Sequence, residues 1–172
     1  YLLCRADLRL LLALTALNGL LGRTMIELLP ALSGQLLAGD STDLATLVAM
    51  AGLGSLLGGF LVSRQSADLD RLLILVCAAI ALAAVNLISL QWFAGMVGLA
   101  CWVTCLSVMT TLAGTGSQTL IQLVTDTEYR GRVMSIWTML TLGAPACGAA
   151  VLGVGVDGLG FARISLLAGA MG

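Results

Sequence analysis

The segment "TDTEYRGRVMSIW", residues 125–137, is the most polar stretch of a chain otherwise dominated by apolar runs. Five of its residues are ionisable within seven positions, and apolar stretches long enough to cross a bilayer lie on both sides. A short charged segment between two such stretches is typical of a turn that joins two membrane helices at the lipid–water interface. The rest of the chain can be divided outward from this turn.

The composition does not suit a water-facing domain. Of 172 residues, 59% are hydrophobic and 10% are charged, whereas soluble domains carry about 25% charged residues. Such a chain can face lipid. The formal net charge is −1 and no basic cluster exists, so we expect no nucleic-acid partner. Histidine, the commonest general base and metal ligand, is absent, and we expect no cofactor or metal.

A membrane helix needs about 20 predominantly apolar residues, and the chain divides into six such segments. We therefore predict an all-α integral membrane protein. The predicted spans are residues 8–29, 44–62, 72–90, 92–124, 133–156 and 161–172, the last one truncated. Because the chain begins with Tyr1 and its last apolar run is unfinished at Gly172, we expect it to be part of a longer protein.

The arginines indicate the orientation of these spans. The loops on one side hold six of the eight arginines, the other side holds one, and Arg23 lies within the first span. Arginine-rich loops stay in the cytoplasm. We therefore predict that the polar turn, the segment before the first span and the loop after the second span are all cytoplasmic.

The polar turn also carries a family resemblance. The segment "IQLVTDTEYRGRVMSIW" resembles the loop between the tenth and eleventh helices of bacterial major facilitator superfamily (MFS) transporters, in the exporter-like branch. Gln122 and the run "RGRVMS", residues 130–135, stand where that loop has the same residues. "ELLPALSGQLL" followed by "AGLGSLLGGFLVSR" is similar to the seventh and eighth helices of that branch.

This resemblance covers essentially the whole chain and implies the C-terminal six-helix half of a twelve-helix fold. Such a fold has two halves around a central cavity and works by alternating access. The resemblance therefore implies an exporter of small molecules in the bacterial inner membrane, with proton antiport as its coupling. It also implies that the N-terminal six-helix half of the same protein is a partner.

One motif departs from the family pattern. The loop after the eighth helix often carries Gly-x-x-x-Asp-Arg-x-Gly-Arg-Arg; here Gly59 and Arg64 match, Ser63 replaces the Asp, and no Gly-Arg-Arg follows. Carboxylates nearby could instead pair with arginines of the polar turn across the cytoplasmic mouth, and solvated loop charges are the alternative. This candidate cytoplasmic gate consists of Arg64, Asp68, Asp70, Arg130 and Arg132.

The fourth span carries a polar stripe whose members fall within about 80° of arc on a helix. The stripe consists of Thr104, Ser107, Thr111, Thr115, Gln118 and Gln122. Lipid does not favour such a stripe, so it faces other helices or a water-filled cavity. Helix packing, with hydroxyls bonded to their own backbone, is one interpretation. The resemblance favours a substrate cavity lined by the first five of these residues.

The first span is predicted to have two faces. A small, weakly polar stripe is formed by Thr15, Asn18, Gly19 and Gly22, of which Asn18 is assigned to the candidate cavity. Arg23 and Glu27 lie on another face and, being four residues apart, can form an ion pair. Charges inside a membrane are functional candidates. Glu27 is the candidate for proton coupling; an ion pair that anchors the outer end of the helix is the alternative.

Small residues are concentrated in the second and fifth spans, where they let helix backbones approach closely. By the resemblance, these helices face the other half of the transporter, and packing within this half is the alternative. The candidates for packing between halves are Gly54, Gly58, Pro145 and Gly148.

The sequence can be interpreted in terms of three classes of function. A transporter accounts for the spans and the polar stripe. An intramembrane serine protease would need a general base for Ser55, and His is absent; paired Asp residues within spans are also missing, so we predict that the protein is not an enzyme. The remaining alternative is a self-contained six-span protein, either structural or an oligomeric channel whose pore the stripe would line.

Overall fold

The computed structural model describes residues 5–30, 41–64, 69–93 and 95–159, with side chains through residue 150. Every regular element in this part of the chain is a helix. The predicted sixth span, residues 161–172, and Asp68 of the candidate gate lie outside the described residues.

Five helical segments are long and apolar enough to cross a membrane, which confirms the predicted all-α membrane fold for the described part of the chain. The first segment is continuous but has three parts, α1, η2 and α2, of which η2 is a π-helical turn. The helices are α1 (Ala6–Asn18), η2 (Gly19–Arg23), α2 (Thr24–Glu27), α4 (Ser41–Ser63), α5 (Leu69–Ser89) with the 3₁₀ turn η3 (Leu90–Trp92), α6 (Gly95–Val124) and α7 (Arg130–Leu159).

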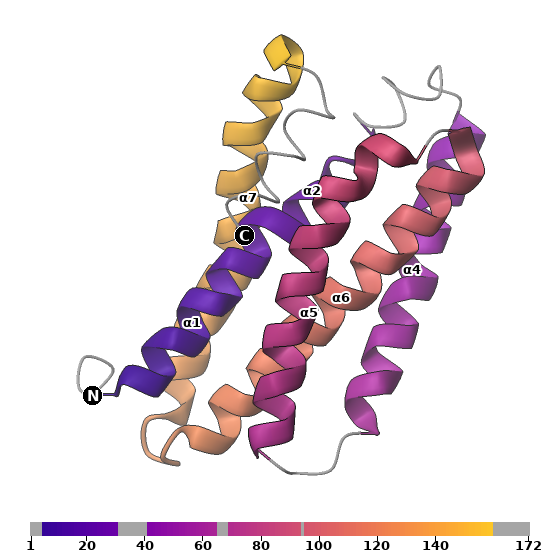
Figure 1. Ribbon diagram of the computed structural model, residues 1–172. Coiled ribbons are helices and arrows are strands. Elements are labelled where there is room, and N and C mark those ends of the chain that lie inside the picture. The colour runs from indigo at the N-terminus through magenta and orange to yellow at the C-terminus, as the bar shows by residue number, and fades with distance from the viewer. Residues whose placement is uncertain (1–4, 31–40, 65–68, 94, 160–172) are drawn as a thin grey trace.

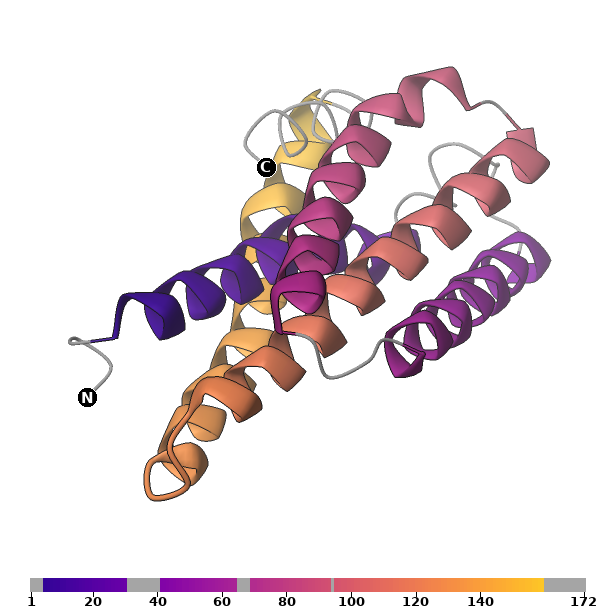
Figure 2. The ribbon, with the colours of Figure 1, turned by 60° about the horizontal axis from the view of Figure 1, so that its bottom comes forward.

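Helix α6 organises the bundle. Figures 1 and 2 show α4 at one edge and α1 with α7 at the other, with α5 and α6 between them. The contact between α4 and α6 is the most extensive, followed by that between α5 and α6. In Figure 1, α1 and α7 begin at the lower end, where α4 ends and α5 begins. We call this the arginine end, and there Arg5 Nη2 donates to the carbonyl of Val124 at 3.3 Å.

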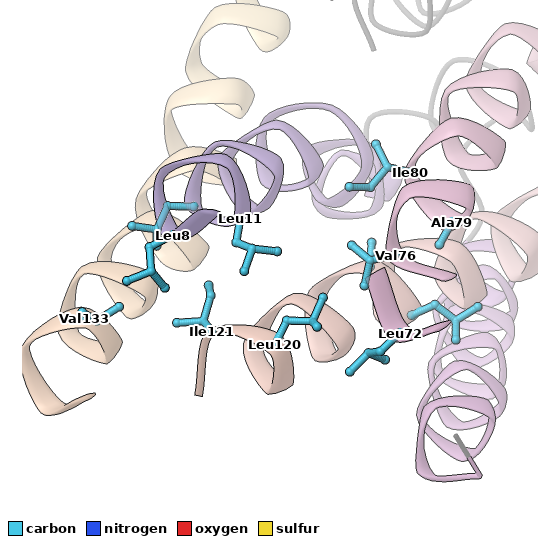
Figure 3. Close-up of a cluster of buried hydrophobic side chains, with 12 residues drawn as sticks. Leu8, Leu11, Leu72, Val76, Ala79, Ile80, Leu120, Ile121 and Val133 are labelled. Carbon is cyan, nitrogen blue, oxygen red and sulfur yellow. The ribbon is translucent and has the colours of Figure 1, made fainter. Parts of the chain in front are cut away.

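Two clusters of buried apolar side chains hold the helices together. The cluster nearer the arginine end joins α1, α5, α6 and α7 through residues such as Leu11, Val76, Ile121 and Val133 (Figure 3). The second cluster joins α2, α4, α5 and α6 around Trp102. The indole N–H of Trp102 is also satisfied, because it donates to the carbonyl of Asn86 at 2.7 Å. Both clusters thus link helices that are distant in sequence.

Glycines allow α4 to lie against α6. An added Cβ on Gly54 would collide with the carbonyl oxygen of Thr104, and one on Gly58 would lie 2.8 Å from the carbonyl oxygen of Val108. These distances are shorter than normal van der Waals contacts, so the two backbones can approach this closely only at glycine.

The four residues assigned to packing between halves are all buried in contacts within this chain. Gly54 and Gly58 contact α6, Pro145 contacts Gly19 of η2, and Gly148 contacts Leu20 and Thr24. The small size of these residues therefore allows neighbouring helices of this chain to pack closely against one another. Among the residues whose side chains are described, the glycines of the same two helices with nothing within 4 Å of an added Cβ are Gly52, Gly59, Gly131 and Gly143.

Candidate functional site

A polar pocket of about 410 Å³ opens among four of the five membrane-crossing segments. The first segment, α4, α6 and α7 contribute to it, and α5 does not. Its lining residues are Thr15, Asn18, Gly19, Arg23, Ile26, Glu27, Ser55, Thr110, Thr111, Gly114, Thr115, Gln118, Trp137 and Thr141. Hydroxyl, amide and charged groups thus gather at one place in an apolar bundle.

The members of the polar stripe of α6 lie in three different environments. Thr111, Thr115 and Gln118 line the pocket. Thr104 and Ser107 lie outside it, in the close contact with α4: the hydroxyl of Thr104 donates to the carbonyl of Ala100 at 2.7 Å, and Ser107 is fully buried. The middle of the stripe therefore faces the pocket, and the part nearer Gly95 packs against α4. Gln122, the member nearest the arginine end, is exposed and lies outside the pocket.

Asn18 joins α1 to α6 at the edge of the pocket. Its side-chain nitrogen donates to the backbone carbonyl of Thr110 at 3.2 Å, although that carbonyl lies 92 residues further along the chain. With its nitrogen engaged in this way, the amide presents its oxygen as an acceptor. The buried hydroxyl of Thr15 donates to the carbonyl of Leu11 at 2.8 Å, which leaves its lone pairs as acceptors as well.

The π turn η2 corrects the prediction that Arg23 and Glu27 lie on a different face from Asn18. The backbone N–H of Thr24 bonds to the carbonyl of Gly19, five residues earlier rather than four. One extra residue in the turn rotates everything after it by about 100° relative to a straight α-helix. Asn18, Arg23 and Glu27 therefore line the same pocket. The prediction of two separate faces was wrong because it assumed a regular α-helix through this segment.

The predicted ion pair between Arg23 and Glu27 is confirmed. Arg23 Nε lies 3.7 Å from Glu27 Oε1, and the two side chains are 51% and 46% exposed. This separation is too long for a hydrogen bond. The pair is thus loose and open to the pocket.

Several lining residues were not predicted. Trp137 and Thr141 lie four residues apart on α7, Ser55 comes from the glycine-rich α4, and Thr110 is the neighbour of a predicted residue. The signal that could have found the α7 pair is its i, i+4 spacing, which places both side chains on one helix face. An isolated Trp and Thr in an apolar helix give no stronger signal.

The candidate gate residues gather at the arginine end. Arg64, Asp70, Arg130 and Arg132 are all exposed there, at the ends of α4, α5 and α7. The guanidinium of Arg64 lies 4.4 Å from the ring centroid of Phe60, a cation–π contact within its own helix. Among the described residues, no group of three or more His, Cys, Asp or Glu side chains is placed to hold a metal ion.

A family model described as transmembrane secretion effector, within the MFS, matches residues 1–172. The chain belongs to this transporter family. No curated protein and no solved structure matches the chain. As a transmembrane secretion effector, it is a multi-pass membrane protein with a function in transport across the lipid bilayer.

Proposed function

We propose that this chain forms one six-helix half of an exporter that moves small molecules out of the cytoplasm by alternating access in a bacterial inner membrane. Its partner in this proposal is the N-terminal six-helix half of the same protein. The pocket would then form part of the substrate site, and Glu27 would carry the proton that couples transport to the proton gradient.

The observation that carries the proposal is the pocket itself. Hydroxyls and amides in a lipid-embedded bundle are costly unless they meet polar partners or water. Here they come from four separate helical segments and converge on one opening of about 410 Å³, within the range of small-molecule sites. In a bundle with only a structural role, gathering these polar groups around an opening would add no stability.

The same geometry bears on the alternative of an oligomeric channel. A pore formed by several copies would need the α6 stripe to face outward from its own bundle. Thr111, Thr115 and Gln118 instead share a pocket with α1 and α7 of the same chain. This arrangement favours a site within one bundle.

The candidate gate is a further part of the proposal. Arg130 and Arg132 begin α7 at the arginine end, where Arg64 and Asp70 also lie. We infer that these charges pair across the cytoplasmic mouth when the pocket opens outward. Asp68 stays a candidate partner.

A comparison of extracellular metabolites tests the exporter without the choice of a particular substrate. The whole protein is expressed in a bacterial host as wild type and as Gln118→Ala, which removes a pocket amide. We expect at least one small molecule to accumulate outside wild-type cells several-fold more than outside Gln118→Ala cells, because a lost hydrogen bond costs about 1 kcal/mol. An uncoupler of the proton gradient should remove this difference.

The matched control is Gln122→Ala. Gln122 lies one turn further along α6, is exposed and does not line the pocket. It should retain the wild-type profile at equal membrane abundance. Identical metabolite profiles for the empty host and the wild type would contradict the exporter function.

A further inference from the structure

The guanidinium of Arg23 has unused binding capacity. It carries five N–H donors, and its contact among the described residues is the 3.7 Å approach of Nε to Glu27. Its side chain is half exposed and lines the pocket. A planar guanidinium with free N–H groups at a pocket is well suited to two parallel hydrogen bonds with a carboxylate.

The pocket is electrically balanced, which limits what it can bind. Arg23 and Glu27 are the charged residues among its lining residues, one of each sign. A solute with a single charge would pair with one of them and leave the other without its counter-charge, which costs electrostatic free energy. A solute with both charges pairs with both.

From these two observations we infer that the pocket binds a small zwitterion with an α-amino carboxylate group. The carboxylate of the solute binds Arg23, and its ammonium group binds Glu27. One long contact is thereby replaced by two short, charge-assisted contacts. This inference rests on the proposed function, since it names the solute class of the same pocket.

The remaining lining supports this orientation. An ammonium group has three donors and needs acceptors, which Asn18 Oδ1 and the lone pairs of the Thr15 hydroxyl supply. The volume of about 410 Å³ leaves room beyond the charged group for an apolar or aromatic portion. Ile26 and Trp137 provide apolar lining for it.

Direct binding of three radiolabelled compounds tests the inference on the whole protein in lipid nanodiscs. The compounds are L-phenylalanine, N-acetyl-L-phenylalanine, which keeps only the carboxylate, and L-phenylalaninamide, which keeps only the ammonium group. We expect wild type to bind L-phenylalanine at least about tenfold more tightly than either analogue, as for a lost charge-assisted pair.

Two variants assign the charges. In Arg23→Gln, L-phenylalanine and its amide should bind equally, because the carboxylate is no longer recognised. In Glu27→Gln, L-phenylalanine and its N-acetyl derivative should bind equally. The control Arg9→Gln, an exposed α1 arginine outside the pocket, should keep the wild-type pattern.

The inference is overturned if wild type shows no saturable binding of L-phenylalanine, if it binds the three compounds equally, or if both variants keep the wild-type preference. Its failure can be told apart from failure of the exporter proposal. Export of a solute that is not zwitterionic would support the exporter proposal and contradict the zwitterion inference. Binding of a zwitterion without any export would support the zwitterion inference and contradict the exporter proposal.

Discussion

At the scale of single residues, Thr24 connects the pocket to the packing behind it. Its side chain is fully buried, and its hydroxyl lies 3.0 Å from the carbonyl oxygen of Gly19 and 3.4 Å from that of Pro145. The first contact supports the π turn, and the second ties that turn to α7. Because Arg23 directly precedes Thr24, the same hydroxyl helps to hold the guanidinium at the pocket.

Thr24→Val should destabilise the protein by about 1 kcal/mol, because the shape is kept while a buried hydrogen-bond donor is lost. Thr46→Val is the matched control: its hydroxyl also bonds to a carbonyl of its own helix, at 2.9 Å, but is exposed. Thermal unfolding in detergent, followed by tryptophan fluorescence, compares the two. An equal loss in both variants would contradict the role assigned to Thr24.

The site residues that could be predicted from sequence are those whose signal is local. The spacing of Thr111, Thr115 and Gln118 matches the helical repeat, which places their side chains on one face of α6. The face of Arg23 depends on one additional residue in the turn that begins at Gly19, and Gly19 lies against Ala144 and Pro145 of α7. That contact joins residues more than a hundred positions apart, so no local pattern reports it.

At the scale of elements, the closest approach is between α4 and α6, and it depends on which glycines face inward. Gly52 and Gly54 are two residues apart and therefore lie on different faces of α4. Gly54 meets the backbone of α6, while nothing lies within 4 Å of an added Cβ on Gly52. The two glycines should respond to the same substitution in opposite ways.

Gly54→Ala should cost about 1–3 kcal/mol, since the new methyl group forces α4 away from α6. Gly52→Ala should instead be neutral or stabilise by up to about 1 kcal/mol, because alanine favours the helix and meets no neighbour. The midpoint of thermal unfolding of each purified variant measures the difference. A stabilised Gly54→Ala protein would show that the helices can separate without cost.

At the scale of the whole molecule, arginines are concentrated at one end of the bundle. Arg5, Arg64 and Arg132 come from three separate parts of the chain, yet all lie at the end where α1 and α7 begin. This common placement is what the arginine count predicted from sequence. The orientation of that end toward the cytoplasm stays a prediction.

A cysteine-accessibility experiment checks the orientation. Thr127→Cys, in the exposed turn between α6 and α7, is made in a background from which the natural cysteines have been removed. A membrane-impermeant maleimide should label it only after the inner membrane is permeabilised. Gln91→Cys, at the opposite end, is the control and should be labelled in intact cells. The reverse pattern would contradict the predicted orientation.

The membrane-crossing helices and the common end of the arginines could be predicted because the length of each apolar segment and the positions of the arginines can be read directly from the sequence. The distribution of small residues was less informative. Gly54, Gly58 and Gly148 are used within the bundle, and their spacing does not distinguish this from contact with another bundle. Only the three-dimensional neighbours of each glycine separate the two uses.

Helices α6 and α7 are each thirty residues long, whereas α4 and α5 have 23 and 21. At 1.5 Å per residue the long pair measures about 45 Å, against a hydrocarbon layer of about 30 Å. Helices longer than the layer adapt by leaning or by thickening the lipid around them. Since α6 and α7 form two walls of the pocket, the thickness of the host membrane is expected to influence how far those walls stand apart.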